Sequence, residues 1–255
     1  MPVAADIYYH IYKTSRGGLK PPVILIHGAG GSHLTWPPEV RRLPEYQVYA
    51  IDLPGHGKSS GRGLQSIHAF TDALLKWLEV VGVHSAIFIG HSMGGAIAIS
   101  LALNHPHQVA GLVLLGSGSR LRVSLPLIEN ASNPTTLNNA FELVLDWSFS
   151  PKASPRLREL VARRLADTRQ SVFLGDFLAC NAFDETAHLC EIQQPALVVC
   201  GAEDRMTPPR YSNYLASNIP SAQLLIIPDA GHMVMLEQPQ AVAAALVGFL
   251  ETISY

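Results

Sequence analysis

The sequence predicts an α/β fold with a mainly parallel sheet and helices on both of its faces. Short aliphatic runs, such as residues 23–26 and 109–115, alternate with segments of helical periodicity. These runs are continuously apolar, as is typical of parallel strands that are buried on both faces. Turn-rich loops containing glycine follow several of them. The alternation therefore indicates βαβ crossover connections.

The first elements begin with residues 6–14, where apolar and polar side chains alternate. That pattern predicts an antiparallel edge strand with one face on the core. Parallel strands are predicted at 23–26 and 47–53, and a short helix begins around Trp36. The first strand ends in His27-Gly28-Ala29-Gly30-Gly31, and the second ends in a turn-rich loop that contains Gly55 and Gly57.

A regular helix and the central strand follow. Ser66 is predicted to cap a helix that Gly82 ends, since serine favours N-caps and glycine favours the residue after a helix. The strand that starts at Ala86 is followed by a helix ending near Pro106, and then by the strand 109–115. These elements continue the strand–helix alternation.

The alternation stops between residues 118 and 194, where three helical patterns and no clear strand occur (137–147, 154–169 and 171–182). We interpret 118–194 as a helical insertion into a core formed by 1–117 and 195–255. The core resumes with the elements expected at 196–200, 210–217, 223–227 and 239–252.

Composition describes an ordinary globular protein. Of 255 residues 48% are hydrophobic and 15% charged, and the net charge is −2, which favours neither nucleic-acid binding nor disorder. The three cysteines form no C-x-x-C pair and are interpreted as buried small side chains. The sequence shows neither a signal peptide nor an apolar run of about 18 residues, so we expect a cytoplasmic protein without a membrane span.

The central motif is Gly90-His91-Ser92-Met93-Gly94, which lies between a predicted strand and a predicted helix. In this context G-x-S-x-G forms a sharp turn that exposes the serine above the sheet. Glycines two residues before and after the serine give the turn the room that it needs. Ser92 is therefore the candidate nucleophile.

A serine needs a general base, and the base needs a carboxylate to orient it. Asp204 and His232 follow the strands predicted at 196–200 and 223–227, so both should lie at the same sheet edge as Ser92. Glu203 and Asp229 are the alternatives for the carboxylate. We favour Asp204, because an aspartate three residues before the histidine is more typical of a turn.

An oxyanion hole is the second requirement of acyl transfer. One donor is expected to be the Met93 N–H, the residue after the nucleophile, and the other the Ala29 N–H in the loop His27-Gly28-Ala29-Gly30. This loop lacks the G-x-G-x-x-G spacing, which argues against a nucleotide-binding turn.

With these motifs in place, the chain resembles the α/β-hydrolase superfamily, specifically its compact serine hydrolases and carboxylesterases with a helical lid. The resemblance runs from Val23 to Leu250 through the motifs HGAGG, DLPGHGKS, GHSMGG, GAEDRMTP and DAGH. It implies a lid between strands six and seven, here 118–194, that determines specificity. Relatives that act as dehalogenases or epoxide hydrolases carry aspartate in place of Ser92.

The substrate pocket is predicted to involve residues from both the core and the insertion. Trp147, Phe149, Phe173 and Phe177 suit an apolar acyl chain, although at helical spacing they suit simple packing equally well. The full set of predicted pocket residues is His27, Gly28, His91, Trp147, Phe149, Phe173, Phe177, Met206 and Met233.

The expected activity is hydrolysis of carboxylic esters of short to medium acyl chains, with no cofactor or metal. Alternative reactions are hydrolysis of a lactone, of a C–C bond in a vinylogous diketone, or of a methyl ester on acyl-carrier protein. An alternative of another class is a signalling or regulatory protein that binds a small ligand. The segment 152–169 could dock an acidic carrier protein, but a solvated helix face is favoured. Its basic residues are Lys152, Arg156, Arg158, Arg163, Arg164 and Arg169, against Glu159 and Asp167.

Overall fold

A computed structural model describes residues 2–13 and 20–253 of the chain. These residues form an eight-stranded sheet of order β1-β2-β4-β3-β5-β6-β7-β8. Strands β3 to β8 run parallel, and β1 and β2 are antiparallel at one edge. The strands are β1 (Val3–Ala4), β2 (Ile7–Tyr12), β3 (Val23–Ile26), β4 (Val48–Asp52), β5 (Ala86–His91), β6 (Val109–Leu115), β7 (Ala196–Gly201) and β8 (Ala222–Ile227).

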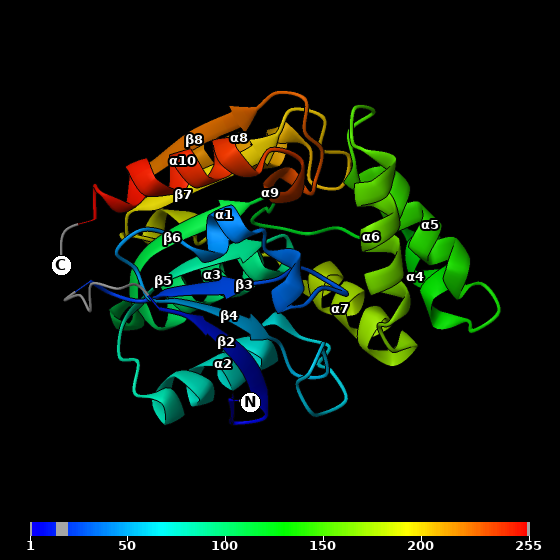
Figure 1. Cartoon of the computed structure of the whole chain (residues 1–255), viewed down its shortest axis with the longest axis horizontal. Helices are drawn as coiled ribbons and strands as arrows, with labels where there is room; N and C mark the ends of the chain where they lie inside the picture. Colours follow the sequence, from blue (N-terminus) through cyan, green and yellow to red (C-terminus); the bar gives the residue numbers. More distant parts are fainter. Residues whose placement is uncertain (1, 14–19, 254–255) are drawn as a thin grey trace.

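Helices cover both faces of the sheet, as the sequence predicts (Figure 1). The hydrophobic core on one face is shared with α2 (Ile67–Val81), α3 (Met93–Asn104) and α8 (Pro209–Asn218). The core on the other face is shared with α1 (Pro38–Arg41) and α10 (Pro239–Leu250). The central strands β3, β5 and β6 are buried almost throughout, which explains their continuous apolar runs.

Four helices lie between β6 and β7 in the sequence: α4 (Leu125–Ser132), α5 (Leu137–Ser148), α6 (Pro155–Ala166) and α7 (Gln170–Ala182). We call residues 118–194, which contain them, the helical insertion. Figure 1 shows these helices grouped beyond the end of the sheet toward which the parallel strands point. The insertion therefore lies over the carboxyl ends of the strands, where ligands collect in α/β folds.

Two details differ from the sequence-based expectation at the edge strand. Asp6 lies in the turn between β1 and β2 with φ of 65°, so the strand begins at Ile7 instead. Thr14, its predicted end, lies outside the described residues. The two-residue strand β1 was not predicted, because so short a segment carries no periodic signal.

The helix predicted to follow Ser66 is α2, and Gly82 ends it in the left-handed conformation with φ of 70°. Ser66 is extended, but its side chain makes no capping hydrogen bond. Helices α4 and α9 (Val234–Glu237) were not predicted. In α4 only Leu127 and Ala131 are buried, which is too few for a recognisable helical pattern.

The cysteines and the lengths of the helices test two further expectations. Cys180 and Cys200 are buried, but Cys190 is exposed, so the prediction that all three cysteines are buried was wrong for Cys190. No helix within residues 2–13 and 20–253 is long and apolar enough to cross a membrane.

Candidate active site

Ser92 lies at a sharp turn between β5 and α3, with φ of 53° and ψ of −115°. A positive φ is unfavourable for a residue with a side chain, so the surrounding structure must hold it. The Ser92 N–H donates to the Leu115 carbonyl oxygen over 2.9 Å. A Cβ at Gly90 would overlap the carbonyl oxygen of Gly94, and a Cβ at Gly94 would overlap that of Ile26. Both glycines are required by this close approach of backbones.

Asp204 and His232 meet in the loops that follow β7 and β8. The Nδ1–H of His232 donates to Oδ2 of Asp204 over 2.9 Å. Asp204 also accepts from the backbone N–H groups of Met206 and Thr207 and from the Thr207 hydroxyl, at 2.8–2.9 Å. Burial raises the pKa of Asp204, but the charge of His232 and these hydrogen bonds outweigh it and hold the pKa below its ordinary value.

The alternative carboxylates lie elsewhere. Asp229 is half exposed, and its carboxylate forms an ion pair with Lys152 over 2.6 Å. The Glu203 N–H donates to the Ala230 carbonyl oxygen, and no hydrogen bond or ion pair joins its carboxylate to His232 among the described residues. Asp204 is therefore the carboxylate that contacts His232, and the second ring nitrogen of His232 is left for Ser92 or a substrate.

The predicted oxyanion loop lies directly against Ser92. A Cβ at Gly28 would be 3.1 Å from Ser92 Cβ and 2.9 Å from His91 Nδ1, so this approach needs glycine. Within the described part of the chain, neither the Ala29 nor the Met93 N–H donates a hydrogen bond. Unpaired N–H groups beside a serine are suited to receive a developing negative charge.

His27 holds this loop from beneath. Its Nδ1–H donates to the Gly28 carbonyl oxygen over 2.8 Å, and its Nε2 accepts from the Leu53 N–H over 3.0 Å. These contacts assign a neutral ring that carries its proton on Nδ1. Burial, together with the nearby positive charge of His56, lowers the pKa of His27 to about 3.

A cavity of about 950 Å³ lies between Ser92 and the helical insertion, and both Ser92 and His232 line it. The predicted pocket residues Gly28, His91, Trp147, Phe177, Met206 and Met233 line it as well, as does Ala29. The side chain of Met93 is buried in the core instead, which leaves only its backbone for a role at the site.

Three predicted pocket residues do not line this cavity, which corrects the sequence-based assignment. His27 is buried beneath the loop. Phe173 is buried in the insertion, where it packs edge-on against Phe141 and Phe177. Phe149 is buried as well, with the Arg158 guanidinium 5.9 Å from its ring centroid. Helical spacing could not separate these packing positions from pocket positions.

Arginines dominate the charge around the cavity. Among the described lining residues Asp167 is the only acidic one, against Arg122, Arg164, Arg169, Arg205 and Arg210. The basic residues of the segment 152–169 fall into two groups by the partners that they contact. Lys152, Arg158 and Arg163 form surface ion pairs, whereas Arg164 and Arg169 donate to backbone carbonyl oxygens of core loops and line the cavity.

Besides the buried pair His33–Asp52, a further buried histidine–carboxylate pair includes His56, which lines the cavity, and it was not predicted. His56, in the loop after β4, contacts Asp176 of α7 with 2.7 Å between Nε2 and Oδ2, and both side chains are fully buried. The signal was an aspartate within the otherwise apolar run 172–180. Such a residue is buried only when it is paired, so its presence there indicates a partner.

His91 lies between the oxyanion loop and His232. Its Nε2–H donates to the His232 carbonyl oxygen over 3.0 Å, and its Nδ1 is buried without a hydrogen-bond partner among the described residues. Burial and the neighbouring His232 lower the pKa of His91 to about 3. A neutral His91 adds no positive charge next to His232.

Comparisons with known proteins agree on one family. The model of the alpha/beta hydrolase family matches residues 23–245. A pimeloyl-[acyl-carrier protein] methyl ester esterase of Aromatoleum aromaticum is 31% identical over 89% of this chain and 97% of its own.

Solved structures lead to the same family. The enol-lactonase from Burkholderia xenovorans LB400 superposes with a TM-score of 0.89, at 25% identity over 96% of both chains. Est816, described as an N-acyl homoserine lactone degrading enzyme, has a TM-score of 0.83 at 29% identity over 95% of this chain and 96% of its own. The chain belongs to the alpha/beta hydrolase family, and its relatives support hydrolase activity.

Proposed function

We propose that this chain hydrolyses carboxylic esters through an acyl-enzyme formed on Ser92. The observation that carries the proposal is the convergence of Ser92 and His232 on one cavity, with Asp204 bound to the far nitrogen of His232. That arrangement supplies a nucleophile, a base and an orienting carboxylate in the roles that acyl transfer requires.

Acylation begins when Ser92 Oγ attacks the ester carbonyl carbon and its proton passes to Nε2 of His232. The carbonyl oxygen becomes an oxyanion, which the N–H groups of Ala29 and Met93 bind. The intermediate then expels the alkoxide, which takes the proton from His232 and leaves as the alcohol. Asp204 holds Nδ1 of His232 throughout and stabilises the imidazolium form.

Deacylation repeats these steps with water. His232 removes a proton from the water as it attacks the acyl carbon, and it returns that proton to Ser92 Oγ as the acid departs. The helical insertion forms the far wall of the cavity through residues such as Val144, Trp147 and Phe177. We assign it the role of a lid that selects the substrate.

The test is turnover of p-nitrophenyl acetate, butyrate and octanoate by the wild-type protein and by Ser92→Ala. We expect multiple turnovers by the wild type and loss of nearly all activity in the variant. Rapid turnover of several simple esters would also argue against a signalling protein that only binds a ligand. Retention of most of the activity by folded Ser92→Ala would refute the proposal.

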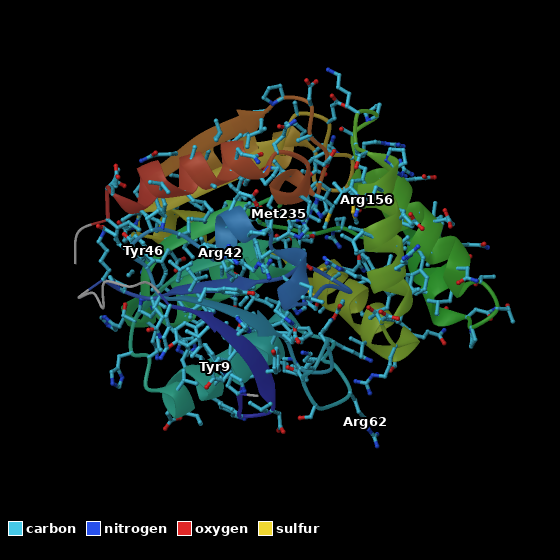
Figure 2. The ribbon with its side chains drawn as sticks, viewed as in Figure 1. Tyr9, Arg42, Tyr46, Arg62, Arg156 and Met235 are labelled. Carbon is cyan, nitrogen blue, oxygen red and sulfur yellow. The ribbon has the colours of Figure 1, made fainter. Side chains whose placement is uncertain are left out.

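A second candidate is hydrolysis of an ester that is attached to an acidic carrier protein. The five arginines around the cavity favour it, and the similar esterase of Aromatoleum aromaticum is named for such a substrate. Arg156 of α6, which Figure 2 labels, is exposed and adds a further positive charge to the helical insertion.

Salt dependence separates the two candidates. Methyl esters of a free acyl chain and of the same chain on acyl-carrier protein are compared at increasing ionic strength. Docking predicts that kcat/KM falls with salt for the carrier-linked ester only, and that Arg156→Gln reproduces part of this fall. Equal salt dependence of both esters would leave the small ester as the substrate class.

A further inference from the structure

The helical insertion holds the peptide groups on both sides of Gly30, the residue after Ala29. The Gly30 N–H donates to Oδ2 of Asp176 over 2.8 Å, and the Thr168 hydroxyl donates to the Gly30 carbonyl oxygen over 3.1 Å. Asp176 belongs to α7, and Thr168 lies between α6 and α7. The helical insertion, more than a hundred residues away in sequence, is thus hydrogen-bonded to the oxyanion loop at Gly30.

The conformation of Gly30 adds a steric constraint. Its φ is +64°, and a Cβ there would lie 2.8 Å from Cδ1 of Leu165 on α6. The Gly31 N–H donates to the Gly28 carbonyl oxygen over 3.0 Å, which closes a turn around Ala29 and Gly30. Ala29 is therefore fixed on one side by the turn and His27, and on the other by the insertion.

The charge of Asp176 is balanced by His56. Nδ1 of His56 lies 3.1 Å from the Pro54 carbonyl oxygen and Nε2 lies 2.7 Å from Asp176 Oδ2, so both nitrogens face acceptors. The ring is then an imidazolium, with a proton on each nitrogen. Asp176 Oδ1 has no hydrogen-bond partner among the described residues, so Oδ2 alone makes both contacts.

We propose that Asp176, together with His56 and Thr168, is a positioning residue that sets the direction of the Ala29 N–H. This inference rests on the proposed function, because it assumes that the Ala29 N–H binds the oxyanion. Asp176 does not line the cavity, whereas His56 and Thr168 do, so Asp176 is the member of this group whose effect cannot come from contact with the substrate. It acts through the Gly30 peptide group, so its effect should appear in the transition state and not in substrate binding.

The experiment compares Asp176→Asn with the wild-type protein. Asparagine keeps the volume of the side chain, but its neutral oxygen accepts more weakly from the Gly30 N–H than a carboxylate does, and the charge that holds His56 is lost. We expect kcat for a p-nitrophenyl ester to fall about 10- to 100-fold, somewhat less than the loss of a whole oxyanion donor. KM should change by less than about threefold, because ground-state contacts remain.

A boronic acid provides the readout that a merely structural role would not change. It forms a tetrahedral adduct with the serine and places an oxygen in the oxyanion hole, so its affinity should fall by the same factor as kcat. Glu159→Gln is the matched control, because it removes an exposed carboxylate from α6 of the same insertion. That variant should match the wild type in kcat, KM and boronate affinity.

Thr168→Val is a second and milder variant, which removes the other contact to Gly30 while preserving shape. It should lower kcat and boronate affinity together by a few-fold, and it decides the question if Asp176→Asn does not fold. Wild-type kcat and boronate affinity in the folded variants would overturn the inference while leaving the proposed function intact. Absence of Ser92-dependent ester hydrolysis in the wild type would instead overturn the proposed function, and this inference with it.

Discussion

Of the three buried histidine–aspartate pairs among the described residues, the two whose histidine lines the cavity differ in their hydrogen bonds. His232 contacts Asp204 over 2.9 Å, and His56 contacts Asp176 over 2.7 Å. His232 uses only Nδ1 for its carboxylate, which leaves Nε2 for chemistry. His56 uses both nitrogens, because Nδ1 is committed to the Pro54 carbonyl oxygen. The first histidine can exchange a proton during turnover, and the second is held in its charged form.

The two carboxylates also differ in the number of hydrogen bonds that they accept. Asp204 accepts three hydrogen bonds besides that of His232, so its negative charge is supported whether His232 is charged or neutral. Asp176 accepts one besides that of His56, from the Gly30 N–H. Among the described residues, His56 is therefore the ion-pair partner of Asp176, and the Gly30 N–H is its other hydrogen-bond donor. We infer that the supporting contacts, and not the residue types, separate the proposed catalytic pair from the proposed positioning pair.

The largest expected effect follows from breaking the first pair with Asp204→Asn. The amide cannot hold Nδ1–H of His232 in the same way, so the wrong tautomer is favoured and kcat should fall by about 10⁴-fold, as in serine proteases. Steady-state kinetics measure the fall, and denaturant unfolding checks that the variant is folded. A folded variant with kcat within tenfold of the wild type would show that Asp204 does not orient the base.

Breaking the second pair should affect stability first. His56→Gln leaves the charge of Asp176 buried without its counter-ion, which costs about 3–5 kcal/mol of unfolding free energy. The double variant His56→Gln/Asp176→Asn should recover part of this loss, because no unpaired charge remains. Urea unfolding measures both, with His68→Gln on the exposed face of α2 as the control. Equal stability of His56→Gln and wild type would mean that the pair is not ionised.

The stability of the protein should depend on pH in opposite ways through its charged and its neutral buried histidines. Burial lowers the pKa of His56, but Asp176 outweighs burial and raises it above 6.5, so its contribution is full below pH 6.5 and is lost as pH rises through the folded value. His27 and His91 behave oppositely, since burial lowers each pKa to about 3. Each should cost about 1.4 kcal/mol of stability for every pH unit between 6.5 and 3.

Urea unfolding of the wild type at pH 5, 7 and 9 checks both signs. Stability should decline steeply from pH 7 to pH 5. On the alkaline side, the wild type should lose stability relative to His56→Gln as His56 deprotonates. A flat profile on the acid side would show that His27 and His91 are not buried in neutral form, which would also remove their support for the site.

Much of the fold was predictable because its signals are local. Gly82 ends α2, and the continuous apolar runs correspond to buried parallel strands. Helix α4 escaped prediction because it buries little apolar surface. In the site, the contact between Asp204 and His232 could be anticipated from the carboxyl ends of neighbouring strands. The pairing of His56 with Asp176 depends on how the insertion packs onto the core, which no local pattern records.

The role of Ser92 as nucleophile is tested most directly by the intact mass of the protein during turnover of a slowly deacylated p-nitrophenyl ester. We expect a mass increase of one acyl group, which peptide mapping places on Ser92 and which Ser92→Ala lacks. His232→Gln should also fail to accumulate the acyl group, while Glu159→Gln should accumulate it normally. Ester hydrolysis without an acyl-enzyme, or acylation at a residue other than Ser92, would show that Ser92 is not the nucleophile.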